Sequence, residues 1–263
     1  MKDYETLSLS RPRDHILVVT LNRPEVRNAM NTQMGLDLRD LWMGFYVDQA
    51  DLRVIILTGS GAHAFCAGGD LKQRNNMTDQ EWQMQHAIYE QATLALLDCP
   101  IPVIAAVNGA AYGGGCEMAL SADFIYAARS ARFALTETRL GIMPGALGTQ
   151  NLPRACGARR AKEIILTASP FTAEEGAEWG IVNRVCDDAT LIDDALETAE
   201  RIASNGPISV RQAKKSISMA QEIDIKSGYA FELEAYNRMV PPEDRLEGVR
   251  AFNEKRAPRF TGR

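Results

Sequence analysis

The stretch from Ile101 to Gln150 constrains the fold of this chain most, because clusters of glycine follow short apolar runs in it. Residues 102–107 (PVIAAV) carry no charge, and their length and β-branched side chains are typical of a buried strand. Asn108-Gly109 breaks this run. Residues 113–115 are all glycine and precede CEMALSAD, whose small and apolar residues are typical of a buried helix. The sequence therefore predicts a strand, a glycine loop and the start of a helix, in that order.

The start of this helix predicts a site for an anion. Its first N–H groups have no partner inside the helix and the peptide dipoles add positive charge, so an oxyanion against Gly114 would be stabilised. Glu117 follows three residues later, which places its carboxylate near the same face of the helix. Two alternatives remain open. In the first, the glycines serve only tight packing and the acid only complements the helix dipole. In the second, the loop binds a dinucleotide, although Met118 stands where G-x-G-x-x-G requires glycine.

A second glycine-rich bend follows the uncharged run VIILT at residues 54–58. It reads AFCAGGDLK, and Asp70 is well placed to cap a helix that begins at Leu71. The N–H of Gly69 is a candidate second donor to the same anion, and two convergent N–H groups make an oxyanion hole. His63 lies nearby without a carboxylate or cysteine at a diagnostic spacing, so we interpret it as a loop histidine.

A second glutamate, Glu137, lies twenty residues beyond Glu117 in a segment that Pro144-Gly145 bounds. It is a candidate partner for Glu117 in acid–base chemistry. The alternative interpretation is a solvated charge on a helix.

Composition excludes several classes of protein. The chain has 263 residues, 46% of them hydrophobic, and its net charge of −5 gives no electrostatic reason to bind nucleic acid or an anionic membrane. Five scattered cysteines form no C-x-x-C pair, so we expect reduced thiols and a cytoplasmic location. We expect no secretory signal at the charged N-terminus, and no membrane span in residues 101–128, which glycines and acids interrupt.

The remaining pattern predicts alternating strands and helices, and then helices alone. Beyond residue 188 the pattern is almost wholly helical, and we place a domain boundary near residue 200. The other predicted features are strands at 4–10, 15–21 and 181–185, a turn at 11–14, helices at 32–48, 78–98, 159–168 and 172–179, and helix breaks at 205–207, near 228 and at 241–242.

Five segments carry a resemblance to a known family, and they occur in the family's order between Val18 and Phe260. They read LNRPEVRNAM, AFCAGGDLK, PVIAAVNGAAYGGGCEMALSADF, FALTETRLGIMPGALGTQNLPR and EDRLEGVRAFNEKRAPRF. On these segments the chain resembles the enoyl-CoA hydratase/isomerase (crotonase) family. The resemblance implies an α/β fold, with a spiral of repeated ββα units over residues 1–200. It also implies a helical region at 201–263 that builds trimers, commonly stacked as hexamers.

The same resemblance implies roles for individual residues. The amides of Gly69 and Gly114 would hold the thioester carbonyl, and Glu117 and Glu137 match the two catalytic glutamates of hydratases. No metal is implied, and no cofactor other than the coenzyme A that belongs to the substrate. The residues implied to contact coenzyme A are Arg27, Ala67, Asp70, Lys72, Phe252 and Lys255.

The implied activity is reversible addition of water across the 2,3 double bond of a 2-enoyl-CoA. Isomerases of the same superfamily need only one base, so the presence of both acids favours hydration over isomerisation. A catalytically inactive scaffold is also disfavoured, because loss of one of the two glutamates would be expected in such a protein. The segments TETRLGI and DRLEGVRAFNEKRAPRF also resemble methylglutaconyl-CoA hydratases, some of which bind RNA. The RNA-binding relative has a lysine-rich first helix, whereas residues 31–51 here contain no lysine, so we expect no RNA binding.

Two positions depart from the family pattern, and the acyl group of the substrate stays open. Leu147 stands where glycine is common, and Asn151 stands where arginine is common, which affects the acyl pocket and a nearby salt bridge. Arg74 and Arg139 are candidates for pairing with a dicarboxylic substrate, although arginine is common on protein surfaces.

Overall fold

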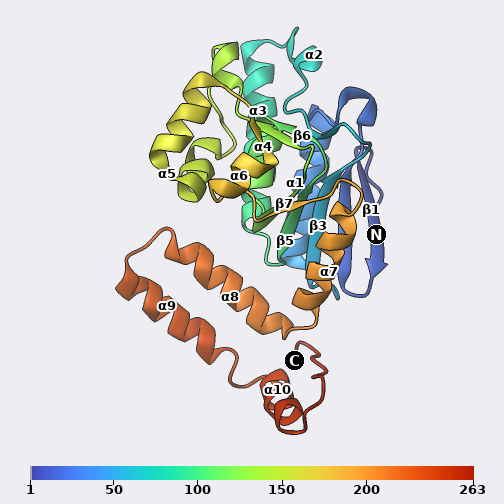
Figure 1. Cartoon of the computed structure of the whole chain (residues 1–263), viewed down its shortest axis with the longest axis vertical. Coiled ribbons are helices and arrows are strands. Elements are labelled where there is room, and N and C mark those ends of the chain that lie inside the picture. The colour runs from blue at the N-terminus through green and yellow to red at the C-terminus, as the bar shows by residue number, and fades with distance from the viewer. Residues whose placement is uncertain (1) are drawn as a thin grey trace.

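A six-stranded sheet forms the centre of the molecule (Figure 1). The computed structural model describes residues 2–263. Five neighbouring strands run parallel, and β1 pairs antiparallel with β2 at one edge. In spatial order the strands are β1 (Leu7–Arg13), β2 (Ile16–Leu21), β3 (Val54–Gly59), β5 (Val103–Val107), β7 (Phe124–Ala128) and β10 (Arg184–Cys186).

A second, four-stranded sheet receives the chain after each of three central strands. Its order is β4 (Ala64–Cys66), β6 (Ala110–Tyr112), β8 (Arg132–Ala134) and β9 (Phe171–Thr172). Thus β3, β5 and β7 are each followed by a short strand of this sheet and then by helices. This repetition confirms the predicted α/β spiral of ββα units.

Helices complete each turn of the spiral. The Asp70 cap predicted for α2 and the Thr172–Glu175 capping box of α6 are both present. The core helices are α1 (Thr32–Val47), α2 (Leu71–Arg74), α3 (Asp79–Leu97), α4 (Gly114–Leu120), α5 (Gly148–Thr167), α6 (Ala173–Glu178) and α7 (Leu191–Ala203), with 3-10 turns η1 (Pro24–Val26) and η2 (Glu137–Leu140).

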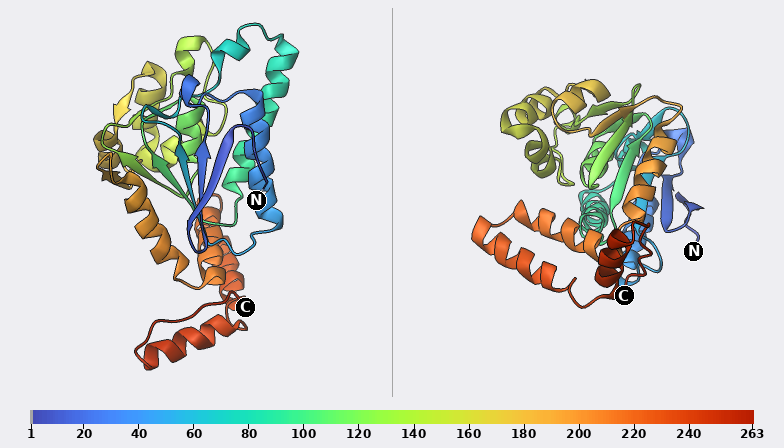
Figure 2. Two further views of the ribbon diagram at one scale, coloured as in Figure 1. Left: turned by 90° about the vertical axis from the view of Figure 1, so that its right-hand side faces the viewer. Right: turned by 60° about the horizontal axis from the view of Figure 1, so that its bottom comes forward.

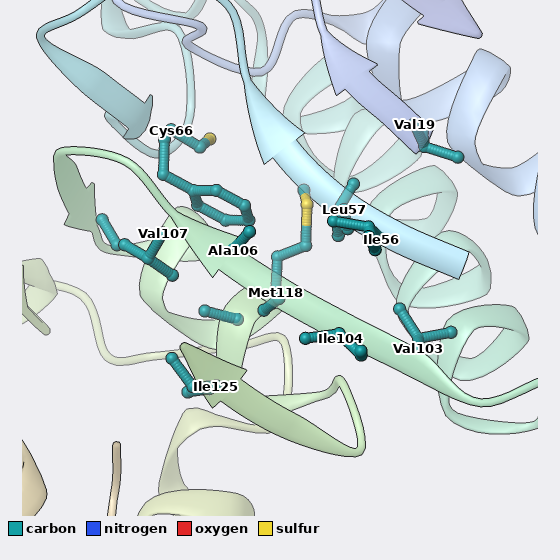
Figure 3. Close-up of a cluster of buried hydrophobic side chains, with 14 of the residues drawn as sticks. Val19, Ile56, Leu57, Cys66, Val103, Ile104, Ala106, Val107, Met118 and Ile125 are labelled. Carbon is teal, nitrogen blue, oxygen red and sulfur yellow. The ribbon is translucent and has the colours of Figure 1, made fainter. Parts of the chain in front are cut away.

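The core lies around β3, β5 and the short helix α4. Side chains such as Ile56 and Ile104 have no exposed surface, which explains why these parallel strands read as continuous apolar runs. Met118 extends from α4 toward β3 and β5 in this cluster (Figure 3). Each such side chain contributes about 1.5–3 kcal/mol by leaving water. This packing holds the glycine-rich start of α4 in one position.

The last three helices extend away from the core (Figures 1 and 2). They are α8 (Pro207–Ala220), α9 (Ile225–Asn237) and α10 (Glu243–Asn253). In contrast, α7 packs against β2, β3, β5 and β7 of the large sheet. The boundary predicted near residue 200 lies within α7 and stays a prediction.

Four predicted element boundaries were wrong. The turn at 11–14 is mostly strand, because β1 is an edge strand and an edge tolerates Pro12. The strand at 181–185 begins only at Arg184. The break near Gly228 lies instead before Asp224, which caps α9, and a glycine inside a helix costs only about 1 kcal/mol. The helix at 159–168 is the end of α5, which bends at Gly157.

Among residues 2–263, none of the helices combines the length and the apolar character that a bilayer crossing requires. Within the same residues, no three His, Cys, Asp or Glu side chains come together as metal ligands would.

Candidate active site

The bend after β4 presents the N–H of Gly69 to a cavity of about 560 Å³. Met30 forms backbone hydrogen bonds with both neighbours of Gly69. The N–H of Met30 donates to the Gly68 carbonyl at 2.7 Å, and the Met30 carbonyl accepts from the N–H of Asp70 at 2.8 Å. Because successive N–H groups of an extended chain point to opposite sides, the N–H of Gly69 points away from Met30. No acceptor among residues 2–263 takes a hydrogen bond from it.

The start of α4 presents a second N–H to the same cavity. Gly113 caps the helix with φ 52° and ψ −126°, a conformation that favours glycine, and its N–H donates to the Ala134 carbonyl at 2.8 Å. Gly114 is the first helical residue, and its N–H has no acceptor in the described chain. A Cβ added at Gly68 would lie 3.5 Å from the nitrogen of Gly114, so the two glycine loops adjoin.

Backbone amides at the start of α5 hold Glu117 in the cavity wall. Its side chain is buried, and its Oε1 accepts hydrogen bonds from the N–H groups of Ala146 and Gly148, both at 2.8 Å. Burial raises the pKa of Glu117, while the two N–H groups act in the opposite direction because they stabilise the carboxylate. A Cβ at Gly148 would lie only 2.8 Å from Oε1, so glycine permits this approach.

Glu137 begins η2 and faces the same cavity with one oxygen unsatisfied. Its pKa is raised to about 7, chiefly by burial and also by the charge of Glu117, while a hydrogen bond from its own backbone N–H acts in the opposite direction. Its Oε2 is buried and has no hydrogen-bond partner among residues 2–263. A Cβ added at Gly113 would lie 3.1 Å from Oε1 of Glu137, so this carboxyl group lies beside the glycine loop that precedes α4. A buried carboxyl oxygen without a partner is suited to a water or a substrate atom.

The structure brings to this one cavity five of the residues that were predicted for catalysis, for the oxyanion hole or for contact with coenzyme A. They are Ala67, Gly69, Gly114, Glu117 and Glu137. The wall also contains aromatic and apolar side chains from α1, α3 and α4. These wall residues include Leu38, Trp42, Trp82, Tyr89, Ala92, Leu96 and Met118.

Three other predicted contacts lie outside the cavity lining. Asp70 caps α2 and pairs with Arg23 at 3.0 Å, so its carboxylate already has partners. Arg27 is exposed, and its carbonyl accepts from the N–H of Ala67 at 3.1 Å. Lys72 is exposed on α2. His63 lies in a bend beside Gly109, as expected of a loop histidine.

The C-terminal candidates also lie outside the cavity lining of their own chain. Phe252 is 83% exposed on α10, and Lys255 follows that helix. At the departures from the family pattern, Leu147 adopts φ 72° before α5, and Asn151 donates to the hydroxyl of Ser121 at 3.2 Å.

The sequence did not predict that the amides of Ala146 and Gly148 hold Glu117. It also did not predict that side chains of α3 hold the guanidinium of Arg74. The segment PGALGTQ carried a signal for the amides, because it placed glycines around the start of a helix. That segment did not reveal which carboxylate the amides hold, because α4 and α5 meet only in the folded chain.

The fold and the cavity together define a protein of the crotonase class. Comparison with known proteins then gives the family: the chain belongs to the enoyl-CoA hydratase/isomerase family, whose sequence model matches residues 11–263. It is 44% identical over 252 residues to the Bacillus subtilis protein YngF, and this alignment covers 95% of each chain. It is also 39% identical over 241 residues to the short-chain-enoyl-CoA hydratase of Clostridium acetobutylicum, covering 92% of each.

The solved structures agree with these sequence comparisons. The crystal structure of an enoyl-CoA hydratase from Bacillus anthracis superposes with a TM-score of 0.96 at 42% identity, and the match covers 98% of this chain and 100% of that one. The family acts on coenzyme A thioesters.

Proposed function

We propose that this protein is an enoyl-CoA hydratase that adds water reversibly across the 2,3 double bond of a 2-enoyl-CoA. One observation carries the proposal: two buried glutamates, Glu117 and Glu137, line one cavity with the unsatisfied N–H groups of Gly69 and Gly114. Hydration needs a base for the water, an acid for C2 and donors for the thioester oxygen. This cavity contains a group for each.

The oxyanion hole lowers the energy of the charge that develops. As the oxygen of water bonds to C3, electron density moves to the thioester oxygen, which would lie against Gly69 and Gly114. Each donor of this kind contributes roughly 2.7–4 kcal/mol in the transition state. Because both N–H groups belong to backbone that other contacts already fix, they need little reorganisation during the reaction.

The two acids have different surroundings, which favours different roles. Glu117 accepts two backbone hydrogen bonds that stabilise its ionised form, so we assign it as the base that takes a proton from water. The pKa of Glu137 is raised to about 7 by burial, so a large fraction keeps its proton at neutral pH. We assign Glu137 as the acid that delivers a proton to C2. Transfer of the captured proton from Glu117 to Glu137, through solvent, then restores both groups for the next turnover.

Self-association belongs to the same proposal. Phe252 and Lys255 lie away from the cavity of their own chain, so contact with coenzyme A would require a neighbouring copy. We propose a trimer or hexamer built through the C-terminal helices. We propose no cofactor besides the coenzyme A of the substrate. The five free cysteines support a cytoplasmic location.

RNA binding is a weaker candidate on the observed surface. The first long helix, α1, contains Asp37 and Asp40, and among its described residues Arg39 is the one cationic side chain. We expect no gel shift with AU-rich RNA at physiological salt, and tight binding there would contradict this assignment.

The test replaces each acid with its neutral isostere. We expect Glu117→Gln and Glu137→Gln each to lower the turnover of crotonyl-CoA by about 10²- to 10⁴-fold, because each removes one proton-transfer group. The affinity for butyryl-CoA, which cannot be hydrated, should change little. Near-normal turnover in either variant would exclude the two-acid mechanism.

A second measurement separates hydration from isomerisation. The wild-type protein is expected to form 3-hydroxybutyryl-CoA from crotonyl-CoA, which mass spectrometry detects as the addition of one water. Migration of the double bond in a 3-enoyl-CoA without any such product would favour the isomerase alternative.

A further inference from the structure

Arg74 places a positive charge in the wall of the cavity, at the end of α2. A Cβ added at Gly69 would lie 3.3 Å from Nη1 of Arg74 and 3.4 Å from Cζ of Arg74. The guanidinium therefore lies next to the loop that contains Gly69. The reaction proposed above does not use this charge. Its position beside the thioester site therefore needs its own explanation.

Three side chains of α3 hold the guanidinium in place. Its central carbon lies 4.2 Å from the ring centre of Trp82 and 5.4 Å from that of Tyr89, which is cation–π distance. Its Nε donates to Oε1 of Gln85 at 2.7 Å. Gln85 is itself buried and fixed, because its amide donates to Thr32 and Gln73, each at 2.9 Å. The orientation of Arg74 is thus set before any ligand binds.

The terminal nitrogens of Arg74 have no acceptor in the described chain. Among residues 2–263, no carboxylate oxygen lies within 4.0 Å of the guanidinium, and only its Nε makes a side-chain hydrogen bond. Burial lowers the pKa of Arg74, although the nearby Tyr89 acts in the opposite direction. A partly buried cation with free donors is stabilised by an anion that fits its planar fork.

We propose that Arg74 binds a second carboxylate on the acyl group, and that the substrates are enoyl-CoA thioesters of short dicarboxylic acids. This inference rests on the proposed function and specifies its substrate class. The carboxylate would lie only a few bonds from the thioester carbon, because the guanidinium adjoins Gly69.

The phosphates of coenzyme A are the other anions of the substrate. The pantetheine arm separates them from the sulfur, whereas Arg74 lies beside the loop that would hold the thioester oxygen. The acyl group is therefore the source of the anion. Arg139 is no rival within the cavity, since it is exposed and outside the lining.

The test compares two saturated thioesters of equal chain length, so that no turnover is required. Calorimetry would measure the binding of glutaryl-CoA and of pentanoyl-CoA to the wild-type protein and to Arg74→Gln. We expect the wild type to bind glutaryl-CoA more tightly by about tenfold to a hundredfold, as expected for charged hydrogen bonds. Arg74→Gln should lose this preference and keep its affinity for pentanoyl-CoA within about threefold.

Two further variants control the experiment. Arg139→Gln removes an exposed arginine and should leave the preference unchanged. Arg74→Lys keeps the charge without the fork and should retain part of the preference, which also keeps the test readable if the neutral variant is unstable.

Two results would overturn the inference: equal affinity of the wild type for both thioesters, or an equal loss for both in Arg74→Gln. The second result would mean that Arg74 supports the loop or the thioester in general. Neither result affects the proposed hydration, which fails separately if crotonyl-CoA and glutaconyl-CoA both remain unreacted.

Discussion

At the scale of single residues, environment rather than residue type distinguishes the two acids. Glu117 and Glu137 are both buried, yet backbone amides hold one carboxylate, while the other has an oxygen without a partner. The sequence predicted that both would be catalytic, but not which one keeps a proton. That difference depends on Ala146 and Gly148, which reach Glu117 only when α5 packs beside α4.

The raised pKa of Glu137 predicts a pH-dependent stability. Its ordinary value is 4.5 and its value in the fold is about 7, so between these the folded state binds more protons than the unfolded state. This carboxyl group makes its full contribution to stability at a pH below 4.5, the pKa of the group in the unfolded chain. The contribution is lost as the pH rises through about 7, the pKa of the group in the folded chain. Glu137→Gln removes that contribution.

Urea unfolding at several values between about pH 5 and about pH 8 would measure this effect. We expect the wild type to lose more stability than Glu137→Gln as the pH rises across this range. Parallel curves for the two proteins would contradict the assignment of a raised pKa to Glu137.

Gly148 gives a sharper test of how Glu117 is held. The added Cβ of Gly148→Ala would lie 2.8 Å from Oε1 of Glu117, so the carboxylate must move. Because a misplacement of about 1 Å can cost about a hundredfold, we expect turnover of crotonyl-CoA to fall by about ten- to a hundredfold. The matched control is Gly44→Ala in α1, where a Cβ meets nothing within 4 Å. Equal activity of the two variants would contradict this positioning role.

At the scale of elements, the cap of α2 connects local folding to the site. The Asp70 side chain accepts from the N–H groups of Lys72 and Gln73, and it pairs with Arg23. Asp70→Ala should lower the free energy of unfolding by about 1–3 kcal/mol, because it removes a cap and leaves the partly buried Arg23 without its carboxylate partner. Thermal unfolding would measure this loss.

Asp70→Asn separates the two contributions, because asparagine also caps helices but carries no charge. We expect it to be less destabilising than Asp70→Ala. An equally large loss in both variants would assign the effect to the ion pair alone, and no loss in either would contradict the role of Asp70.

The elements that the sequence predicted correctly are those that local chemistry determines. The cap at Asp70, for example, depends on residues within one turn of helix. The extent of β1 depends instead on its pairing with β2, and its Arg-Pro-Arg segment resembled a turn until that partner was known. The surroundings of Arg74 were not predictable for the same reason. The residues that contact its guanidinium, Trp82, Tyr89 and Gln85, belong to α3, and no local pattern places α3 beside Arg74.

At the scale of the whole molecule, the C-terminal helices present an apolar surface to solvent. In α8 and α9 the buried positions are Pro207 and Ala235. Helices of this length are marginal alone and depend on packing of an apolar face. One exposed apolar row follows α9 at helical spacing: Ile225, Tyr229, Leu233 and Tyr236.

This apolar row predicts that the proposed trimer or hexamer depends on α9. Tyr229 and Leu233 are 58% and 43% exposed in the single chain, so their burial against another copy would favour association. The double variant Tyr229→Glu with Leu233→Glu would place charges in that contact and should yield smaller species in analytical ultracentrifugation. Glu234→Gln, on the opposite side of α9, is the control. If the double variant keeps the mass of the wild type, α9 is not the interface, whereas a smaller species with weaker binding of coenzyme A thioesters would support contact of Phe252 and Lys255 with a neighbouring site.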